Sequence, residues 1–343
     1  MIERGIVGAE VHDDERLFEA SLRPRSLADF TGQEKLKKNL AIAIAAAKMR
    51  DEAMDHVLLY GPPGLGKTTL ATLIANELGV TFEQTAAPVL QKKLDLTGLL
   101  SNIRSKQVFF IDEIHRLSPD VEEMLYSALE DFRVDIIVGA GPGARTHSLP
   151  VPKFTAVGAT TRLGNISAPL RGRFGLMLRL DIYDPAELAG IVRRSAKILN
   201  VPMDGPTSEE IARRSRGTPR IANRLLRRVR DFAQVEANGN MSEEIAIAAL
   251  DLLEVDPLGL DEVDRRIMLS ILEKFDGGPV GLNTLSSAVD EEAGTIEDVY
   301  EPYLIQQGFL DRTPRGRIAT ERAYSYFGVS RRGTAGGPPN VLF

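Results

Sequence analysis

The apolar positions in the first half of the chain fall in short unbroken runs, separated by stretches with a helical period. The runs at 56–60, 107–111 and 153–159 have the length and apolar content of strands buried on both faces. The stretches 67–78 and 119–131 repeat their apolar residues every three or four positions, as amphipathic helices do. Strands that alternate with helices predict a parallel sheet covered by helices, and therefore an α/β fold.

The rest of the chain is predicted to be mostly helical. Apolar residues recur at helical spacing over 185–199, 208–214, 220–237 and 242–253, and then over 261–275, 281–289 and 295–306. A two-stranded turn is expected at 310–319, with Pro314 and Gly316 at its tip.

Turn signals divide the chain into parts. Aspartate–proline pairs stand at 184–185 and 256–257, each after an apolar or helical stretch, and the residue before a proline is biased away from helix. The last residues are rich in glycine and proline and cannot build a core. We therefore expect an α/β domain at 1–182, a helical domain at 183–255, a third small domain at 256–330 and a disordered tail at 331–343.

A glycine-rich segment follows the first predicted strand and opens a helix. Residues 61–69 read GPPGLGKTT, a full match to the phosphate-binding pattern G-x-x-x-x-G-K-[ST] in the context that it requires. Gly61, Gly64 and Gly66 would let the backbone fold tightly and point its N–H groups inward, and these donors and the helix N-terminus would hold phosphate oxygens. Lys67 would reach the β- and γ-phosphates, and Thr68 would ligate Mg²⁺. The alternative is an ordinary glycine-rich turn.

Two carboxylates at the end of the second predicted strand suit the same site. Residues 108–117 read VFFIDEIHRL, so that Asp112 ends an apolar strand and Glu113 follows it. Asp112 would support Mg²⁺ and Glu113 would activate the attacking water. Residues 112–115 also spell the D-E-x-H box of another helicase superfamily. That superfamily needs a second α/β domain, which the helical segment is too small to form, so His115 is expected to be a cap or a surface residue.

Three later motifs carry further candidates. The third strand ends VGATTR, so Thr160 or Thr161 is expected to point a hydroxyl at the γ-phosphate. Arg171 and Arg173 lie in the proline- and glycine-bounded segment 169–175, and an arginine there could stabilise charge at a neighbouring subunit's phosphate. A surface salt-bridge pair is an equally open interpretation of these two arginines.

A fourth motif opens a predicted helix at 220. Pro219 suits the first turn of a helix, and Arg220 at its start could face a phosphate. Further arginines follow at helical spacing at 224, 227 and 228. By default, we interpret these arginines as the solvent-exposed face of the helix.

Composition narrows the classes of function. Of 343 residues, 43% are apolar and 26% are charged, as is ordinary for a globular protein. The chain has no cysteine, which excludes a disulfide scaffold, a cysteine nucleophile and a thiolate zinc site. No apolar run approaches the ~20 residues that a bilayer needs, and the first residues lack an apolar signal core. We therefore expect a cytosolic protein that does not interact with membranes.

The net charge of −6 argues against DNA as a partner until it is divided along the chain. Residues 256–343 carry nine basic and fourteen acidic side chains, for a net charge of −5. Within them, 309–332 carry six arginines against Asp311 and Glu321, for a net charge of +4. A local basic patch therefore lies inside the most acidic segment.

Together, these motifs resemble the AAA+ ATPases, and more closely the RuvB family of bacterial Holliday-junction branch-migration motors. The resemblance adds an entry segment at 22–33 and a terminal segment at 308–320, and it covers about 15–328. It implies an AAA+ P-loop ATPase core with a helical lid and a C-terminal winged-helix domain, with ATP and Mg²⁺ as cofactors. It implies a nucleotide site made by Leu22, Arg23, Gly64, Leu65, Gly66, Lys67, Thr68, Thr69, Glu130, Asp131, Phe132, Arg173, Tyr183 and Arg220.

The resemblance also assigns roles within that set. Glu113 and Lys67 would be catalytic, and Thr161 would sense the γ-phosphate. Arg173, with Arg171 as its rival, would be the arginine finger that reaches the phosphate of the next subunit. Thr68 and Asp112 would support the metal. Arg220 would be a second sensor, and Tyr183 would lie at the junction between the ATPase core and the lid.

Partners follow from the resemblance as well. The insertion 133–152 alternates apolar and polar positions around a GAGPG turn, and an uncovered apolar hairpin is a candidate for protein interaction. It resembles the hairpin that docks RuvA, which would be contacted by Ile136, Ile137, Val138 and Leu149. The resemblance further implies a homohexamer around double-stranded DNA at Holliday junctions, the RuvC resolvase as a partner, and action at the bacterial nucleoid.

The last segment resembles a winged helix, but its charge distribution is unusual for a DNA reader. Its predicted recognition helix lies among five acids, at 291, 292, 297, 298 and 301, which phosphates would repel. The arginine-bearing turn is then the part that meets the DNA backbone, and the resemblance points to Arg312 and Arg317. The alternative is that these arginines pair with the domain's own acids.

The sequence gives less support to three other classes of function. A clamp-loader-like ATPase is the main alternative, although a zinc-bearing region would favour it and no cysteine is present. A protein unfoldase would need an aromatic pore loop, and 90–103 contain no aromatic residue. A non-enzymatic scaffold would not need Lys67, Asp112 and Glu113 together.

Overall fold

In the computed structural model, residues 18–138 and 145–331 are described. Their central feature is a parallel sheet of five strands in the order β2-β3-β6-β1-β7. The strands are β1 (Val57–Tyr60), β2 (Phe82–Ala86), β3 (Val108–Asp112), β6 (Thr155–Thr160) and β7 (Leu176–Arg179). The predicted parallel α/β sheet is therefore confirmed, as are the three strands expected from their apolar runs.

Two strands of this sheet were not predicted. β2 and β7 lie at the two edges of the sheet, where part of each strand is exposed to solvent. Edge strands do not need the continuous apolar run that marks a strand buried on both faces. FEQTA lacks that signal, and LMLR is a shorter apolar stretch that ends in an exposed arginine.

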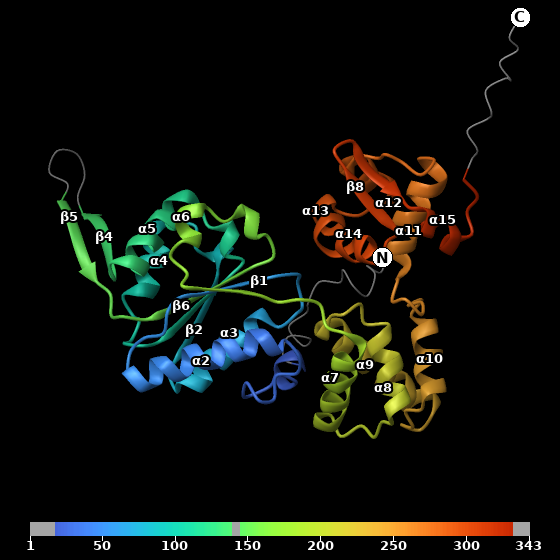
Figure 1. Cartoon of the computed structure of the whole chain (residues 1–343), viewed down its shortest axis with the longest axis horizontal. Helices are drawn as coiled ribbons and strands as arrows, with labels where there is room; N and C mark the ends of the chain where they lie inside the picture. Colours follow the sequence, from blue (N-terminus) through green and yellow to red (C-terminus); the bar gives the residue numbers. More distant parts are fainter. Residues whose placement is uncertain (1–17, 139–144, 332–343) are drawn as a thin grey trace, which may run out of the picture. The chain divides into compact units, whose positions relative to one another are not determined.

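Helices cover both faces of the sheet (Figure 1). Helices α2 (Glu34–Arg50) and α3 (Lys67–Leu78) lie on one face, and α4 (Lys93–Leu100), α5 (Pro119–Glu130) and α6 (Ala168–Arg171) lie on the other. Short single turns lie between a strand and the next helix at Ala87–Val89 (η1), Ile114–Arg116 (η2) and Leu163–Asn165 (η4). The α3 and α5 bounds agree closely with the predicted helices.

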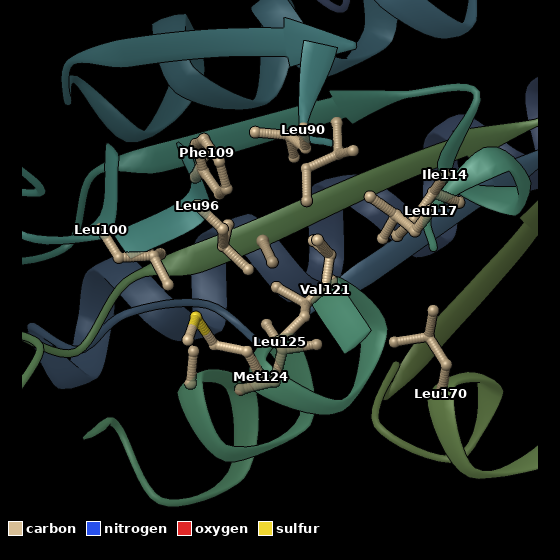
Figure 2. Close-up of a cluster of buried hydrophobic side chains, with 14 of the residues drawn as sticks. Leu90, Leu96, Leu100, Phe109, Ile114, Leu117, Val121, Met124, Leu125 and Leu170 are labelled. Carbon is tan, nitrogen blue, oxygen red and sulfur yellow. The ribbon is translucent and has the colours of Figure 1, made fainter. Parts of the chain in front are cut away.

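Successive strand residues point to opposite faces, so the two helical layers each have their own core. Phe109 and Ile111 of β3 point toward α4 and α5, and Figure 2 shows Phe109 among the leucines of that cluster. Leu170 of α6 and Val121 of α5 complete the same cluster. This core ties α6 to α5.

An antiparallel hairpin follows α5. It is formed by β4 (Arg133–Val138) and β5 (Arg145–Pro150), with Val134 opposite Leu149. The predicted hairpin is confirmed, while its GAGPG turn at 139–143 lies outside the described residues. The expected disordered tail also falls outside them, except for residue 331.

The chain divides into two compact units, each described by itself. The described part of the first contains 18–191 and 217–220, and that of the second contains 192–216 and 221–331. The predicted helices of the middle segment are present as α7 (Pro185–Ile198), α8 (Gly205–Arg213), α9 (Pro219–Glu236) and α10 (Glu243–Leu252). Among the described residues, no helix is both long and apolar enough to span a membrane.

The C-terminal part of the second unit has three helical segments and then a hairpin. The helices are α11 (Glu262–Leu269) with its continuation η5 (Ser270–Lys274), α12 (Leu282–Val289), and the run α13 (Ala293–Thr295), η6 (Ile296–Tyr300) and α14 (Glu301–Gln306). The hairpin consists of β8 (Leu310–Thr313) and β9 (Gly316–Ala319), and α15 (Glu321–Phe327) follows it. This is the expected winged-helix arrangement, with α15 as an unpredicted addition.

Candidate nucleotide site

The phosphate loop connects the carboxyl end of β1 to the first turn of α3. Its glycines have backbone angles that side chains rarely adopt, with φ of 144° at Gly61 and 77° at Gly64. A Cβ on Gly61 would lie 2.3 Å from the carbonyl oxygen of Leu180, so no other residue fits there. The loop therefore needs glycine for its own shape, and that shape brings backbone N–H groups together at a helix N-terminus.

The Lys67 ammonium lies buried inside this loop. Its Nζ donates to the carbonyl oxygens of Gly61 and Pro62, both at 2.8 Å. Burial lowers the pKa of Lys67 to about 8, although the nearby carboxylate of Asp112 opposes this. A desolvated ammonium held by neutral carbonyls gains from a phosphate group, so the residues present fit a nucleotide phosphate chain.

Asp112 and Glu113 lie at the end of β3, close enough to Lys67 for both carboxylates to act on its pKa. The N–H of Glu113 donates to Asp112 Oδ1 at 2.9 Å. Glu113 itself has a left-handed backbone, with φ of 49°, and its carboxylate pairs with Arg116 at 2.9 Å. The acids predicted for the metal and for the attacking water are thus grouped beside the phosphate loop.

The donor set also fits Mg²⁺ with a nucleotide rather than a metal cage made by protein alone. No group of three or more acidic or histidine side chains able to hold a metal occurs in the described part of the chain. Mg²⁺ commonly takes one or two protein ligands, with phosphate oxygens and waters completing its octahedron. Thr68, in the first turn of α3, and Asp112 could supply those protein ligands.

The two candidate threonines differ in their surroundings. Thr160 is buried, its hydroxyl lies 3.0 Å from His115 Nδ1, and it accepts the N–H of Arg162 at 2.9 Å. Thr161 follows it at the end of β6, which pairs with β1 directly before the phosphate loop. The hydroxyl of Thr160 is thus engaged within the protein, which leaves Thr161 as the predicted sensor. His115 is half-buried and bonded to Thr160 rather than a surface residue.

Segments distant in the sequence meet the phosphate loop. The Tyr183 hydroxyl donates to the Leu65 carbonyl at 3.2 Å, and the Arg220 N–H donates to the Gly64 carbonyl at 3.4 Å. Leu22 is buried. Farther along the same N-terminal segment, the ring of Phe30 lies next to Gly66. The structure therefore brings together most of the residues that were expected around the nucleotide.

Other contacts at the loop were not predicted. Glu19 pairs with Arg220 at 3.2 Å, and Thr218 lies beside Gly64. Phe30 and Arg116 are further examples, since nothing in their local sequence indicates that they lie beside Gly66 or pair with Glu113.

Arg173 lies at the opposite end of the sheet from Lys67. It precedes β7, whose first residue, Leu176, is opposite Val57 at the amino end of β1, whereas Lys67 lies beyond the carboxyl end of β1. A four-residue strand spans roughly 13 Å, which is longer than an arginine side chain. The guanidinium of Arg173 pairs instead with Glu130 at 2.5 Å.

The segment 130–132 lies at the same end of the sheet as Arg173, away from the phosphate loop. Asp131 pairs with Arg133 at 3.4 Å. The Phe132 ring packs against His56 and Phe154, with centroids 6.2 and 6.1 Å apart, at the amino ends of the strands. The structure therefore does not bring these three predicted nucleotide-binding residues to the loop of their own subunit.

The predicted partner and DNA residues lie elsewhere. In the β4–β5 hairpin, Leu149 is exposed and Ile136 is half-buried against the core, while the backbones of Ile137 and Val138 belong to β4. In the winged helix, Arg312 is exposed and pairs with Glu297.

Arg317 is buried and paired inside the winged helix. Its side chain is 9% exposed, and its guanidinium makes two bonds to the Glu301 carboxylate, at 2.5 and 3.1 Å. This buried ion pair agrees with the alternative stated above, in which the arginine pairs with an acid of its own domain. Arg315, in the turn between β8 and β9, is exposed.

The parallel sheet, the phosphate loop around Lys67 and the acids at the end of the adjacent strand define a P-loop ATPase of the AAA+ class. Three family patterns match in order: the Holliday junction DNA helicase RuvB P-loop domain over 22–180, the RuvB AAA lid domain over 183–256, and the RuvB C-terminal winged helix domain over 257–328. The chain belongs to the RuvB family.

Individual relatives support the same assignment. The chain is 68% identical over 342 residues to the Holliday junction branch migration complex subunit RuvB of Solibacter usitatus, covering 100% of this chain and 99% of the relative. It is 61% identical to that of Koribacter versatilis, over 94% of this chain and 89% of the relative. The solved Thermotoga maritima RuvB Holliday junction branch migration motor is 50% identical, with a TM-score of 0.82 over 90% of this chain and 98% of that one.

Proposed function

We propose that the chain is the ATP-driven motor subunit that moves the branch point of Holliday junctions in DNA recombination and repair. The observation that carries this proposal is the phosphate loop built around buried Lys67, with Asp112 and Glu113 at the end of the adjacent strand. It is supported by relatives named as branch migration subunits, which match over 100% and 94% of the chain.

The nucleotide site assigns a step to each of its groups. The loop amides and Lys67 bind the phosphates, and Thr68 and Asp112 hold Mg²⁺, which supplies charge neutralisation at the phosphates. Glu113 takes a proton from the attacking water through its carboxylate, and Thr161 positions the γ-phosphate. Glu113 is paired with Arg116 at 2.9 Å, so this contact opens when the carboxylate turns to the water.

The finger acts between subunits. Because Arg173 lies at the amino end of the sheet, its guanidinium reaches a phosphate only in a neighbouring copy of the chain. Glu130, Asp131 and Phe132 share that end of the sheet, so their role toward nucleotide also belongs to the neighbour's site. A ring is the closed arrangement that repeats such a head-to-tail contact, and we assign a homohexamer.

The other partners follow from the family. Residues 1–182 form the ATPase domain, 183–255 the lid, 256–330 the winged helix and 331–343 a tail.

The β4–β5 hairpin docks RuvA through Ile136, Ile137, Val138 and Leu149, and RuvC joins the complex at the junction. Arg312 meets the DNA backbone, and exposed Arg315 is better placed than buried Arg317 to join it. The site of action is the bacterial cytoplasm, at the nucleoid.

The test is ATP-dependent migration of a synthetic four-way junction, with and without RuvA. The wild-type chain should move the junction, while Glu113→Gln should bind ATP with unchanged affinity and lose at least about a hundredfold in turnover, as expected for a general base. The matched control is Glu123→Gln, an exposed acid on α5 that pairs with Lys93. Activity on other DNA structures but not on junctions would contradict the proposed substrate, and full turnover by Glu113→Gln would remove Glu113 from its role.

A further inference from the structure

The helix that precedes Arg173 is a single turn. α6 contains only Ala168–Arg171, and one turn of helix is not stable in isolation. Its apolar side is fixed by Leu170 and by Phe174 just beyond it, which are both buried in the cluster against α5 (Figure 2 shows Leu170). Its polar side needs a separate support, because the first N–H groups of a helix have no helical partner.

That support comes from three side chains. The Ser167 hydroxyl caps α6 by accepting the N–H of Leu170 at 3.2 Å. The same hydroxyl donates to the Glu122 carboxylate and lies 2.8 Å from the Tyr126 hydroxyl. Tyr126 also donates to Glu122, so the two hydroxyls bind one carboxylate and the three side chains form a network. Glu122 and Tyr126 are four residues apart on α5 and therefore share one face of that helix.

The network lies close to the finger. Burial, and then the hydrogen bond to Glu122, raise the pKa of Tyr126, so its hydroxyl keeps the proton that it donates. The charge of Arg173 opposes this rise, which places the guanidinium within electrostatic reach of Tyr126. At the C-terminal end of α5, Glu130 pairs with Arg173 directly. Helix α5 thus contacts both Ser167, which caps α6, and the guanidinium of Arg173.

We propose that Glu122, Tyr126 and Ser167 are positioning residues for Arg173: they fix α6 on α5 so that the guanidinium is presented to the neighbouring subunit. This inference rests on the proposed function, in which Arg173 acts in the neighbour's nucleotide site. The three residues act through Arg173 and belong to the subunit that donates the finger, not to the one that hydrolyses ATP.

The position of α5 gives the network a further consequence. α5 begins at Pro119, six residues after Glu113, and ends at Glu130 beside the finger. A displacement at the end of β3 on nucleotide binding would therefore reach α6 through a single rigid helix.

The test uses mixtures of full-length subunits. Lys67→Ala subunits have an intact finger and a disabled pocket, and Arg173→Ala subunits have an intact pocket and no finger. The parent mixture should regain ATPase activity at junctions between the two types. Tyr126→Phe or Ser167→Ala on the Lys67→Ala subunit should lower that regained activity about fivefold, the usual effect of one lost hydrogen bond. When the same changes are made on the Arg173→Ala subunit, the regained ATPase activity should stay within about twofold of that of the parent mixture.

Matched controls and a second readout separate positioning from general damage. Ser118→Ala removes a buried hydroxyl from the start of α5 that has no hydrogen-bond partner, and it should not lower the regained activity on either subunit. In nucleotide-free protein, amide hydrogen exchange over 168–174 should become about fivefold faster in Ser167→Ala, because the Leu170 N–H loses its acceptor. Exchange in α3 should not change.

The outcomes distinguish the two levels of the proposal. If the parent mixture regains no activity, the action of Arg173 between subunits is wrong and the positioning role fails with it. If the parent mixture regains activity but the network variants lower it equally on both subunits, or on neither, only the positioning role is overturned. Unchanged exchange over 168–174 in Ser167→Ala would also overturn it.

Discussion

At the scale of single residues, the first strand of the phosphate-loop sheet is anchored by a neutral histidine. His56 Nδ1 accepts the N–H of Ala156 at 2.9 Å, and Nε2 lies 3.0 Å from the Leu129 carbonyl. Both bonds require an unprotonated Nδ1 and a proton on Nε2. Burial lowers the pKa of His56 below its ordinary value of 6.5, although the Leu129 carbonyl and Asp55 oppose this.

This geometry predicts a loss of stability in mild acid. The unfolded chain takes up a proton on His56 below pH 6.5 and the folded protein does not, so stability falls as the pH drops from 6.5 toward the lowered pKa. The slope from this one group is at most about 1.4 kcal/mol per pH unit. Urea unfolding between pH 7.5 and 5.5 should therefore show a shallower pH dependence in His56→Asn. The exposed His147→Asn serves as control, and equal slopes for all three proteins would contradict the assignment.

At the scale of elements, the winged-helix hairpin uses its arginines in different ways. Arg317 is buried against Glu301 and Arg312 pairs with Glu297, so two positive charges of the basic patch are matched by acids of the preceding helical run. Exposed Arg315 lies at the turn. The acids that appeared to repel DNA are in part the internal partners of this hairpin.

Two substitutions separate these uses. Arg315→Ala should leave stability unchanged and reduce the salt dependence of DNA binding by about one phosphate contact, measured as the slope of log affinity against log salt. Arg317→Ala should lower the free energy of unfolding by about 3–5 kcal/mol, because the Glu301 carboxylate would remain buried without a partner. If Arg317→Ala kept its stability and lost DNA affinity, a direct DNA contact by Arg317 would be restored.

Local sequence predicted those elements and sites whose parts are contiguous. The phosphate loop with Lys67 and the strand ending at Asp112 could be located because strand, turn and helix signals stand side by side. The approach of Phe30 to Gly66 and the burial of Arg317 depend on chain segments far apart, for which spacing carries no signal. The edge strands β2 and β7 were missed for a related reason, since part of each is exposed and the apolar pattern is short.

At the scale of the whole molecule, a buried ion pair inside the second unit holds the winged helix to the end of the preceding helical segment. Arg216 makes two bonds to the Asp264 carboxylate, at 2.8 and 3.2 Å, and the Tyr303 ring lies 4.2 Å from its guanidinium. The next residues, 217–220, belong to the unit that contains the phosphate loop. The pair thus fixes the winged helix to the residues that directly precede the boundary between the two units.

Breaking one side of this pair should be costly. Asp264→Ala would leave the Arg216 guanidinium buried without its carboxylate, which typically costs about 3–5 kcal/mol. The double variant Arg216→Met with Asp264→Leu removes both charges and should recover most of that loss. Urea unfolding of the full chain measures both effects. A double variant as unstable as Asp264→Ala would mean that packing, rather than the unpaired charge, causes the loss.

The placement of Lys67 and Arg173 at opposite ends of one sheet has a kinetic consequence. With the role proposed for Arg173, a lone subunit has a nucleotide pocket but no arginine that reaches it, so turnover requires contact between two copies. Hydrolysis per subunit should then rise with protein concentration until assembly is complete, and dilution should silence it. Under this proposal, dispersed subunits would leave ATP intact, and hydrolysis would be confined to places where copies assemble.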